Sequence, residues 1–223
     1  MAYILQIETT TQQCSVALSF KGKTLALKEE RTAGYSHSEK LHVFIQSLLE
    51  ESTFSWDRLD AIAVSKGPGS YTGLRIGIAA AKGLCFAKEI PLIAINTLDI
   101  MAQAVNVESG YVIPMLDARR MEVYTAVYDH QKKTVFSTTA LVLTPDSLVD
   151  IVTSRPCKVI GNGATKFENL SPKLKASFDS EVYPSASDMS QLAWEKFQQH
   201  KVEDIAYFEP YYLKDFQTTP AKK

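Results

Sequence analysis

One glycine-rich run, residues 67–77, carries the residue types and spacing best suited to binding chemistry in this chain of 223 residues. It reads Gly-Pro-Gly-Ser-Tyr-Thr-Gly-Leu-Arg-Ile-Gly, follows the apolar run 61–64 and opens an apolar helical pattern. Glycines allow positive φ and close backbone approach, and the free N–H groups of a helix start favour an anion. The run therefore predicts a loop that holds a phosphate or another chain, with a tight turn without a ligand as the alternative. It is not a P-loop, because no Gly-Lys-Ser/Thr follows at the required spacing.

The elements around this loop form an ordered pattern in the first half of the chain. Apolar and alternating residues predict a three-strand meander, a helix, a strand, the loop with its helix, a further strand and a further helix. These elements are expected at 3–8, 15–20, 25–27, 37–51, 61–65, 74–87, 91–95 and from 96 or 97. Ser36 and Glu39 form a capping box for the helix at 37–51.

The second half repeats this order. Three strands are expected at 112–116, 122–128 and 135–143, a helix from 144–146, a short strand at 159–160 and a further helix at 188–199. The polar stretch 106–110 separates the halves, which predicts domains 1–107 and 108–223, with the C-terminal segment free to pack back on the first half. The fold class is therefore α/β, with two βββαβα halves.

Bulk composition limits the classes of partner. The chain has 24 basic and 25 acidic residues, so it lacks the basic excess of a free-standing nucleic-acid binder. It has no 18-residue apolar run and no signal peptide, which argues against a membrane partner. Cys14, Cys85 and Cys157 are far apart and odd in number, which suits a reducing compartment and argues against a zinc site. A cytoplasmic protein is expected.

Two successive βββαβα units resemble the duplicated ribonuclease-H-like halves of the actin, sugar-kinase and Hsp70 ATPase superfamily, the actin-like ATPase (ASKHA) fold. Three motifs are more specific: Ile-Leu-Gln-Ile-Glu-Thr-Thr at 4–10, the run 67–77, and Asp-Ala-Arg-Arg-Met-Glu-Val-Tyr at 117–124. In order and spacing they closely resemble the TsaB (YeaZ) family, over nearly the whole chain. One departure is Glu8, where these proteins usually carry Asp; the extra methylene would push the carboxylate further into the cleft.

The resemblance implies a function as a non-catalytic partner of TsaD. That enzyme places the threonylcarbamoyl group on the adenosine 3′ to the anticodon, in transfer RNAs that read codons beginning with A. A small ATPase, TsaE, would join the pair, and transfer RNA would be met only through the complex. A homodimer and a monomer are both open for the isolated chain.

The superfamily resemblance raises an ATP-binding ATPase or kinase as an alternative, with ATP or ADP held weakly between the halves or at the complex interface. Such an enzyme needs a roomy phosphate turn in each half and a glycine-rich adenosine loop. The second turn, 117–120, lacks glycine and places two long cations there, which on an extended chain would point to opposite faces. A hydrolase is therefore not indicated, although a phosphate-loop remnant is open, at Glu8, Thr9, Thr10, Gly67, Gly69, Ser70, Asp117, Arg119, Gly161 and Gly163.

A metallopeptidase is the other enzyme alternative, because the family was once grouped with such peptidases. The resemblance places the two metal-binding histidines of TsaD at Thr97 and Met101, and neither side chain replaces a histidine ligand. The four histidines of this chain, His37, His42, His130 and His200, form no catalytic arrangement on the expected elements. No metal site, resident cofactor or catalytic residue is expected.

The helix at 74–87 points instead to a binding surface. Only Arg75 and Lys82 are charged in it, so apolar side chains cover most of its circumference. Small residues recur every four positions, which allows another helix to approach closely; cover by other parts of the same chain is the alternative. The expected partner interface comprises Gly73, Leu74, Ile76, Gly77, Ala80, Ala81 and Leu84, together with Leu41 and Ile45 of the helix at 37–51.

Overall fold

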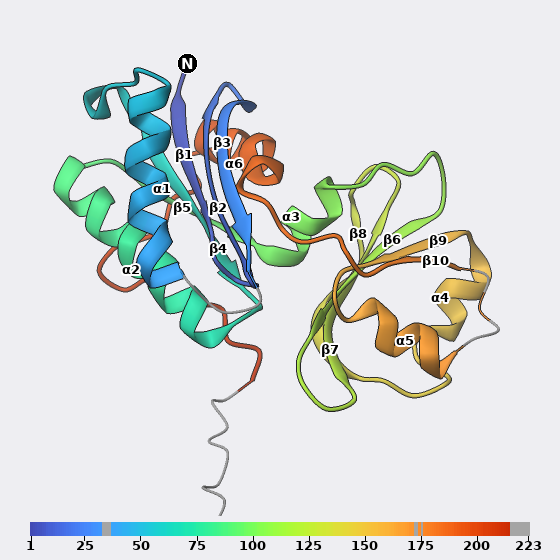
Figure 1. The fold of residues 1–223 in the computed structure, drawn as a ribbon. Coiled ribbons are helices and arrows are strands. Elements are labelled where there is room, and N and C mark those ends of the chain that lie inside the picture. The colour runs from blue at the N-terminus through green and yellow to red at the C-terminus, as the bar shows by residue number, and fades with distance from the viewer. Residues whose placement is uncertain (33–36, 172–173, 175, 215–223) are drawn as a thin grey trace, which may run out of the picture.

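The computed structural model describes residues 1–32, 37–171, 174 and 176–214. The first lobe is built on a five-stranded mixed sheet with the order β3-β2-β1-β4-β5 (Figure 1). Its strands are β1 (Tyr3–Glu8), β2 (Gln13–Phe20), β3 (Lys23–Arg31), β4 (Ala61–Gly67) and β5 (Leu92–Asn96). The meander β1-β2-β3 is antiparallel, whereas β1, β4 and β5 run parallel. The carboxyl ends of β1, β4 and β5 therefore meet at one edge of the sheet.

The second lobe repeats this topology. Its sheet has the order β10-β9-β6-β7-β8, which is the first order read from the opposite edge. The strands are β6 (Tyr111–Asp117), β7 (Glu122–Asp129), β8 (Thr134–Val142), β9 (Cys157–Ile160) and β10 (Ala176–Asp179). The predicted α/β fold with two similar halves is confirmed.

Helices cover both faces of the first sheet (Figure 1). The helices and 3-10 turns are α1 (His37–Glu51), η1 (Trp56–Arg58), α2 (Tyr71–Lys88), α3 (Thr97–Gln103), α4 (Val149–Ser154), α5 (Ala164–Leu170), η2 (Ala186–Met189) and α6 (Ser190–Gln198). Helices α1 and α2 pack on the face that presents Leu5, Ile7 and Val16. Helix α3 lies between the lobes, with Ile100 in a core cluster of the first and Met101 in one of the second.

The C-terminal part of the chain returns from the second lobe to the first (Figure 1). In α6, Ala193 packs on the first-sheet face that presents Ile4 and Ile93. Residues 203–214, named the C-terminal strap here, then follow the first lobe: Glu203 forms a bridge with Leu92, and the Tyr211 amide donates to the Lys66 carbonyl over 2.7 Å. The predicted boundary near residue 107 falls in the link between α3 and β6.

The structure differs locally from the sequence expectations in the start of one helix and in one additional strand, and one expectation lies outside the described residues. The helix expected from Thr144 begins at Val149 as α4, because Thr144 and Ser147 instead close a turn through a 2.9 Å bond from the Thr144 amide to the Ser147 hydroxyl. Strand β10 was not expected from the sequence. The capping box includes Ser36, which lies outside the described residues. Among the residues that the structure describes, no helix is long and apolar enough to cross a membrane.

Candidate functional site

The start of α2 is closed by the chain itself. The Ser70 hydroxyl caps the helix by accepting from the Gly73 amide over 3.2 Å. The Ser70 amide donates to the carbonyl of Thr10, in the turn after β1, over 2.7 Å. Two of the amides that the sequence offered to an anion are therefore bonded within the chain.

The glycines of α2 serve this internal contact. A Cβ on Gly73 would lie 2.0 Å from the Thr9 carbonyl oxygen, and one on Gly77 would lie 2.2 Å from the Thr9 hydroxyl. A Cβ on Gly69, which precedes the helix, would lie 2.6 Å from the Thr10 carbonyl oxygen. The small-residue row was expected to admit a helix of another protein; in the structure the turn after β1 occupies it. The side of α2 that Gly73 and Gly77 present is therefore already covered by the chain itself, and a helix that is apolar all round does not reveal in its sequence which side that is.

Glu8 is buried at the carboxyl end of β1 and holds the turn after it. Its Oε1 accepts from the Thr10 amide over 2.6 Å and also from the Thr10 hydroxyl. Burial raises the pKa of Glu8 from 4.5 to about 7, although the bonds from Thr10 and the nearby Ser65 hydroxyl oppose the rise, and the Asp188 carboxylate adds to it. Glu8 therefore acts as an internal cap of the turn after β1.

The corresponding turn of the second lobe is closed in a similar way. Asp117 Oδ1 accepts from the Arg119 amide over 2.6 Å and from Lys166 Nζ over 2.7 Å, while the Asp117 amide donates to Asn162 Oδ1 over 2.9 Å. Arg119 and Arg120 have φ values of 68° and 50°, so they lie in a left-handed turn and both side chains are exposed. The expectation that they alternate on an extended chain was wrong, because the hairpin reverses at these two residues.

The Gly161–Gly163 segment packs tightly on β6. Gly161 has a φ of 96°, and a Cβ there would lie 2.5 Å from the Met115 carbonyl oxygen. The Gly163 amide donates to that same oxygen over 2.9 Å. These contacts are those of a strand-to-helix turn. Gly67, in the glycine-rich run after β4, is also closely packed: a Cβ there would lie 2.8 Å from the Tyr211 carbonyl oxygen of the strap.

The two positions matched to metal-binding histidines are core positions. Thr97 and Met101 are both fully buried in α3. Of the four histidines, His37 is buried with its Nε2 2.7 Å from the Thr11 carbonyl oxygen, and burial lowers its pKa. The other three are exposed. Within the described part of the chain, no three His, Cys, Asp or Glu side chains lie together as a metal ion would require.

The nine residues expected at a partner interface divide between the core and the surface. Six are buried within the chain: Leu41, Ile45, Gly73, Leu74, Gly77 and Ala81. Ile76, Ala80 and Leu84 are half-buried and pack at the edge of the core cluster of the first lobe. The outer side of α2 carries three exposed residues that were not assigned to the interface, Ala79, Gly83 and Phe86, and the Phe86 side chain is 80% exposed. These three exposed residues can be found from helical geometry: once the buried residues fix the side of α2 that faces the sheet, the residues on the opposite side follow.

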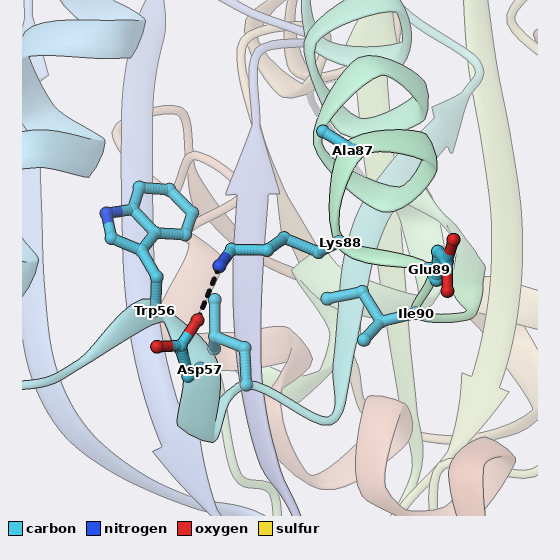
Figure 2. Close-up of a pocket in the computed structure, with 7 residues that line it drawn as sticks. Trp56, Asp57, Ala87, Lys88, Glu89 and Ile90 are labelled. Atoms are coloured by element: carbon cyan, nitrogen blue, oxygen red, sulfur yellow. Dashed lines mark hydrogen bonds and ion pairs between the residues drawn. The ribbon is translucent and has the colours of Figure 1, made fainter.

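The far end of α2 borders a cavity of about 360 Å³ beside η1 (Figure 2). Trp56 and Ile90 form apolar walls, and Lys88 Nζ forms an ion pair with Asp57 Oδ1 over 2.7 Å. This hydrogen bond and the Lys88 charge lower the pKa of Asp57. The pair is largely exposed, so it adds little to stability, and no residue of the closed turns lines the cavity.

Two mixed sheets of equal strand order, joined through α3, define the duplicated ribonuclease-H-like, actin-like ATPase class of α/β proteins. EutJ, an ethanolamine utilization protein from Carboxydothermus hydrogenoformans, shares this fold, with a TM-score of 0.51 at 11% identity over 86% of this chain and 90% of that chain. The family model for TsaD, described as tRNA N6-adenosine threonylcarbamoyltransferase, matches residues 30–222.

Three relatives that are more similar in sequence carry the name TsaB or YeaZ. The tRNA threonylcarbamoyladenosine biosynthesis protein TsaB of Escherichia coli K12 is 33% identical over 95% of this chain and 94% of that protein. TsaB of Haemophilus influenzae is 28% identical over 95% and 93%. YeaZ from Pseudomonas aeruginosa superposes with a TM-score of 0.81 at 30% identity, over 96% of this chain and all of that one. The chain belongs to the TsaB family of tRNA threonylcarbamoyladenosine biosynthesis proteins.

Proposed function

We propose that this protein is a non-catalytic subunit that pairs with TsaD through the outer side of α2 and the neighbouring surface of α1. TsaD would transfer the threonylcarbamoyl group to the adenosine 3′ to the anticodon, in transfer RNAs that read codons beginning with A. TsaE would join the pair, and transfer RNA would be bound through the complex. The protein acts in the cytoplasm.

The observation that carries this proposal is the uncovered outer side of α2. Ile76, Ala79, Ala80, Gly83 and Phe86 follow one another along it, and Arg75 and Lys82 are the charged residues beside them. No atom lies within 4 Å of a Cβ built on Gly83, so this side is open to a neighbour. Burying a phenylalanine side chain stabilises an assembly by roughly 1.5–3 kcal/mol. An apolar stripe of this kind on an otherwise packed helix favours association.

The closed turns support the non-catalytic part. A phosphate needs backbone amides and open space at both turns, but here Glu8, Thr10 and Ser70 bond one another at the first. At the second turn the Asp117 carboxylate is bonded to Arg119 and Lys166. The groups that would hold a nucleotide's phosphates thus already have partners in the chain.

The interface is tested with Ala79→Glu and Phe86→Ser. Both residues are exposed, so the variants should fold with nearly the wild-type thermal midpoint, while association with purified TsaD in sedimentation velocity falls by at least ~tenfold, about 1.4 kcal/mol. Val142→Glu is the matched control, because Val142 is 62% exposed on β8 in the other lobe. Gly77 is unsuitable for this purpose, because its substitution would strike Thr9. Variants that fold and bind TsaD as tightly as wild type would remove α2 from the interface.

The non-catalytic role is tested by reconstitution. The chain alone, supplied with threonylcarbamoyl-adenylate and transfer RNA, should give no modified nucleoside and hydrolyse no ATP. Product should require TsaD and should decrease with the Ala79→Glu variant. Modified nucleoside from this chain alone would overturn the proposal.

A further inference from the structure

A second cavity of about 360 Å³ lies at the joint between the lobes, separate from the closed turns and from the outer side of α2. It lies where β4 and β5 end, and it is bordered by β7 and β8 of the second lobe, by α6 and by the C-terminal strap. None of the phosphate-loop candidates lines it. Its volume is within the range of small-molecule sites.

Two lysines bring positive charge to this cavity. Lys66 comes from the end of β4 and Lys196 from α6. Lys196 Nζ donates to the Ala94 carbonyl over 2.6 Å, which leaves two of its three donors over. Lys66 Nζ lies 5.9 Å from the centre of the Tyr211 ring, and among the described residues neither lysine forms an ion pair. Burial and the neighbouring Lys66 lower the pKa of Lys196, while the nearby Asp99 and Glu203 carboxylates act in the opposite direction.

Other groups that line the cavity are polar but not cationic. Tyr128 donates to Asp99 Oδ1 over 2.5 Å, and Asn96 Nδ2 donates to Thr138 Oγ1 over 3.2 Å. The bond from Asn96 joins the end of β5 to the second lobe, and the bond to Asp99 joins α3 to the second lobe. The Asp99 carboxylate and the hydroxyl groups here suit a partner that carries hydroxyl groups, whereas the lysines suit an anion. A ligand that contacted both the lysines and these groups would also hold the lobes in one relative orientation.

We propose that this cavity binds a small phosphate monoester that carries hydroxyl groups, with its phosphate at Lys66 and Lys196 and its hydroxyls towards Asp99 and Thr138. A dianionic phosphate satisfies both ammonium groups at once. The flat ring of Tyr211 forms a wall for the carbon skeleton. Inorganic phosphate would fill only part of the volume, so the ester contributes contacts that the free ion lacks.

The test titrates the full-length protein with ribose 5-phosphate, inorganic phosphate and ribose, at constant ionic strength, by isothermal titration calorimetry. Ribose 5-phosphate should bind at least ~tenfold more tightly than inorganic phosphate, and ribose should give no heat. Equal affinity for the ester and for inorganic phosphate would overturn the assignment of the hydroxyl side. Absence of binding of the ester at about 10 mM would overturn the site.

Charge variants locate the binding. Lys66→Gln should weaken ribose 5-phosphate binding by at least ~tenfold. Lys23→Gln, which removes the same charge on exposed β3, should leave binding within about twofold of wild type. Lys196→Gln is a second variant, and thermal midpoints confirm that each protein is folded. Equal weakening by Lys23→Gln, or wild-type binding by folded Lys66→Gln, would overturn the site. Because Ala79→Glu lies on another surface, it should bind the ester normally whatever its effect on TsaD.

Discussion

Thr9 and Gly73, 64 positions apart, join the turn after β1 to helix α2: the Thr9 hydroxyl donates to the Gly73 carbonyl over 2.8 Å. No side chain fits at Gly73, because a Cβ would lie 2.0 Å from the Thr9 carbonyl oxygen. The glycine-rich run thus locks two segments of one lobe together.

Substitution of Gly73 by alanine should therefore destabilise the protein. We expect the free energy of unfolding to fall by about 2 kcal/mol or more, because backbone atoms must move to accept the Cβ. Gly83→Ala is the matched control in the same helix; its Cβ meets open space, so it should raise the free energy by about 0.5–1 kcal/mol. Urea denaturation followed by circular dichroism measures both. Equal effects of the two substitutions would contradict the role of the Thr9 contact.

Glu8 should make the protein less stable as the pH rises. Its pKa is raised to about 7 in the folded protein from 4.5, so the folded state keeps a proton that the unfolded chain loses between these values. The stabilisation is complete below about pH 4.5 and is lost as the pH rises through about 7, a change of about 3 kcal/mol. Glu8→Gln, which cannot ionise, should match wild type near pH 5 and be more stable at pH 8. Glu108→Gln is the matched control, because Glu108 is exposed in the link 106–110. A Glu8→Gln variant that gains nothing at pH 8 would show that burial does not raise the pKa of Glu8.

The strap should loosen when Lys82 is replaced. Lys82 Nζ donates to the Phe208 carbonyl over 3.0 Å, so Lys82→Met removes a bond from α2 to the strap. Hydrogen exchange at the Phe208 and Tyr211 amides should become ~tenfold faster, about 1.4 kcal/mol, while the amides of β1 keep their protection. Lys88→Met, which removes only the exposed pair with Asp57, should leave the strap unchanged.

Transfer RNA should bind weakly to the isolated chain. The formal net charge is −1, so few phosphates can be neutralised and little counter-ion release drives binding. Gel shifts near physiological salt should show little or no retention. Submicromolar affinity that falls steeply with salt would reveal a basic surface on the folded protein.

The order of the elements along the first half and the meander of the second could be predicted because alternation and short turns mark the meanders, and the glycine run marks one strand-to-helix connection, whereas β10 was missed. The orientation of α2 could not, because Leu74, Ile78 and Phe86 are equally apolar and only the tertiary contact with Thr9 selects the buried side. The left-handed turn at Arg119 and Arg120 also escaped prediction, since neither residue favours positive φ and the bond from the Arg119 amide to Asp117 stabilises it. Glu8 as a cap of Thr10 is a local pattern, two residues apart, that the sequence could have indicated.

Helix α6 covers a face of the first sheet although the whole second lobe separates them in the chain. During synthesis, Ile4, Ala63 and Ile93 therefore remain without this cover until residues 190–198 have left the ribosome. The second lobe is synthesised between the strands of the first lobe and the helix that covers them. The first lobe therefore cannot complete its core while its own strands are being translated. A product that ends before α6 would expose this apolar face and should be recognised by chaperones or aggregate, even though it contains every strand of both sheets.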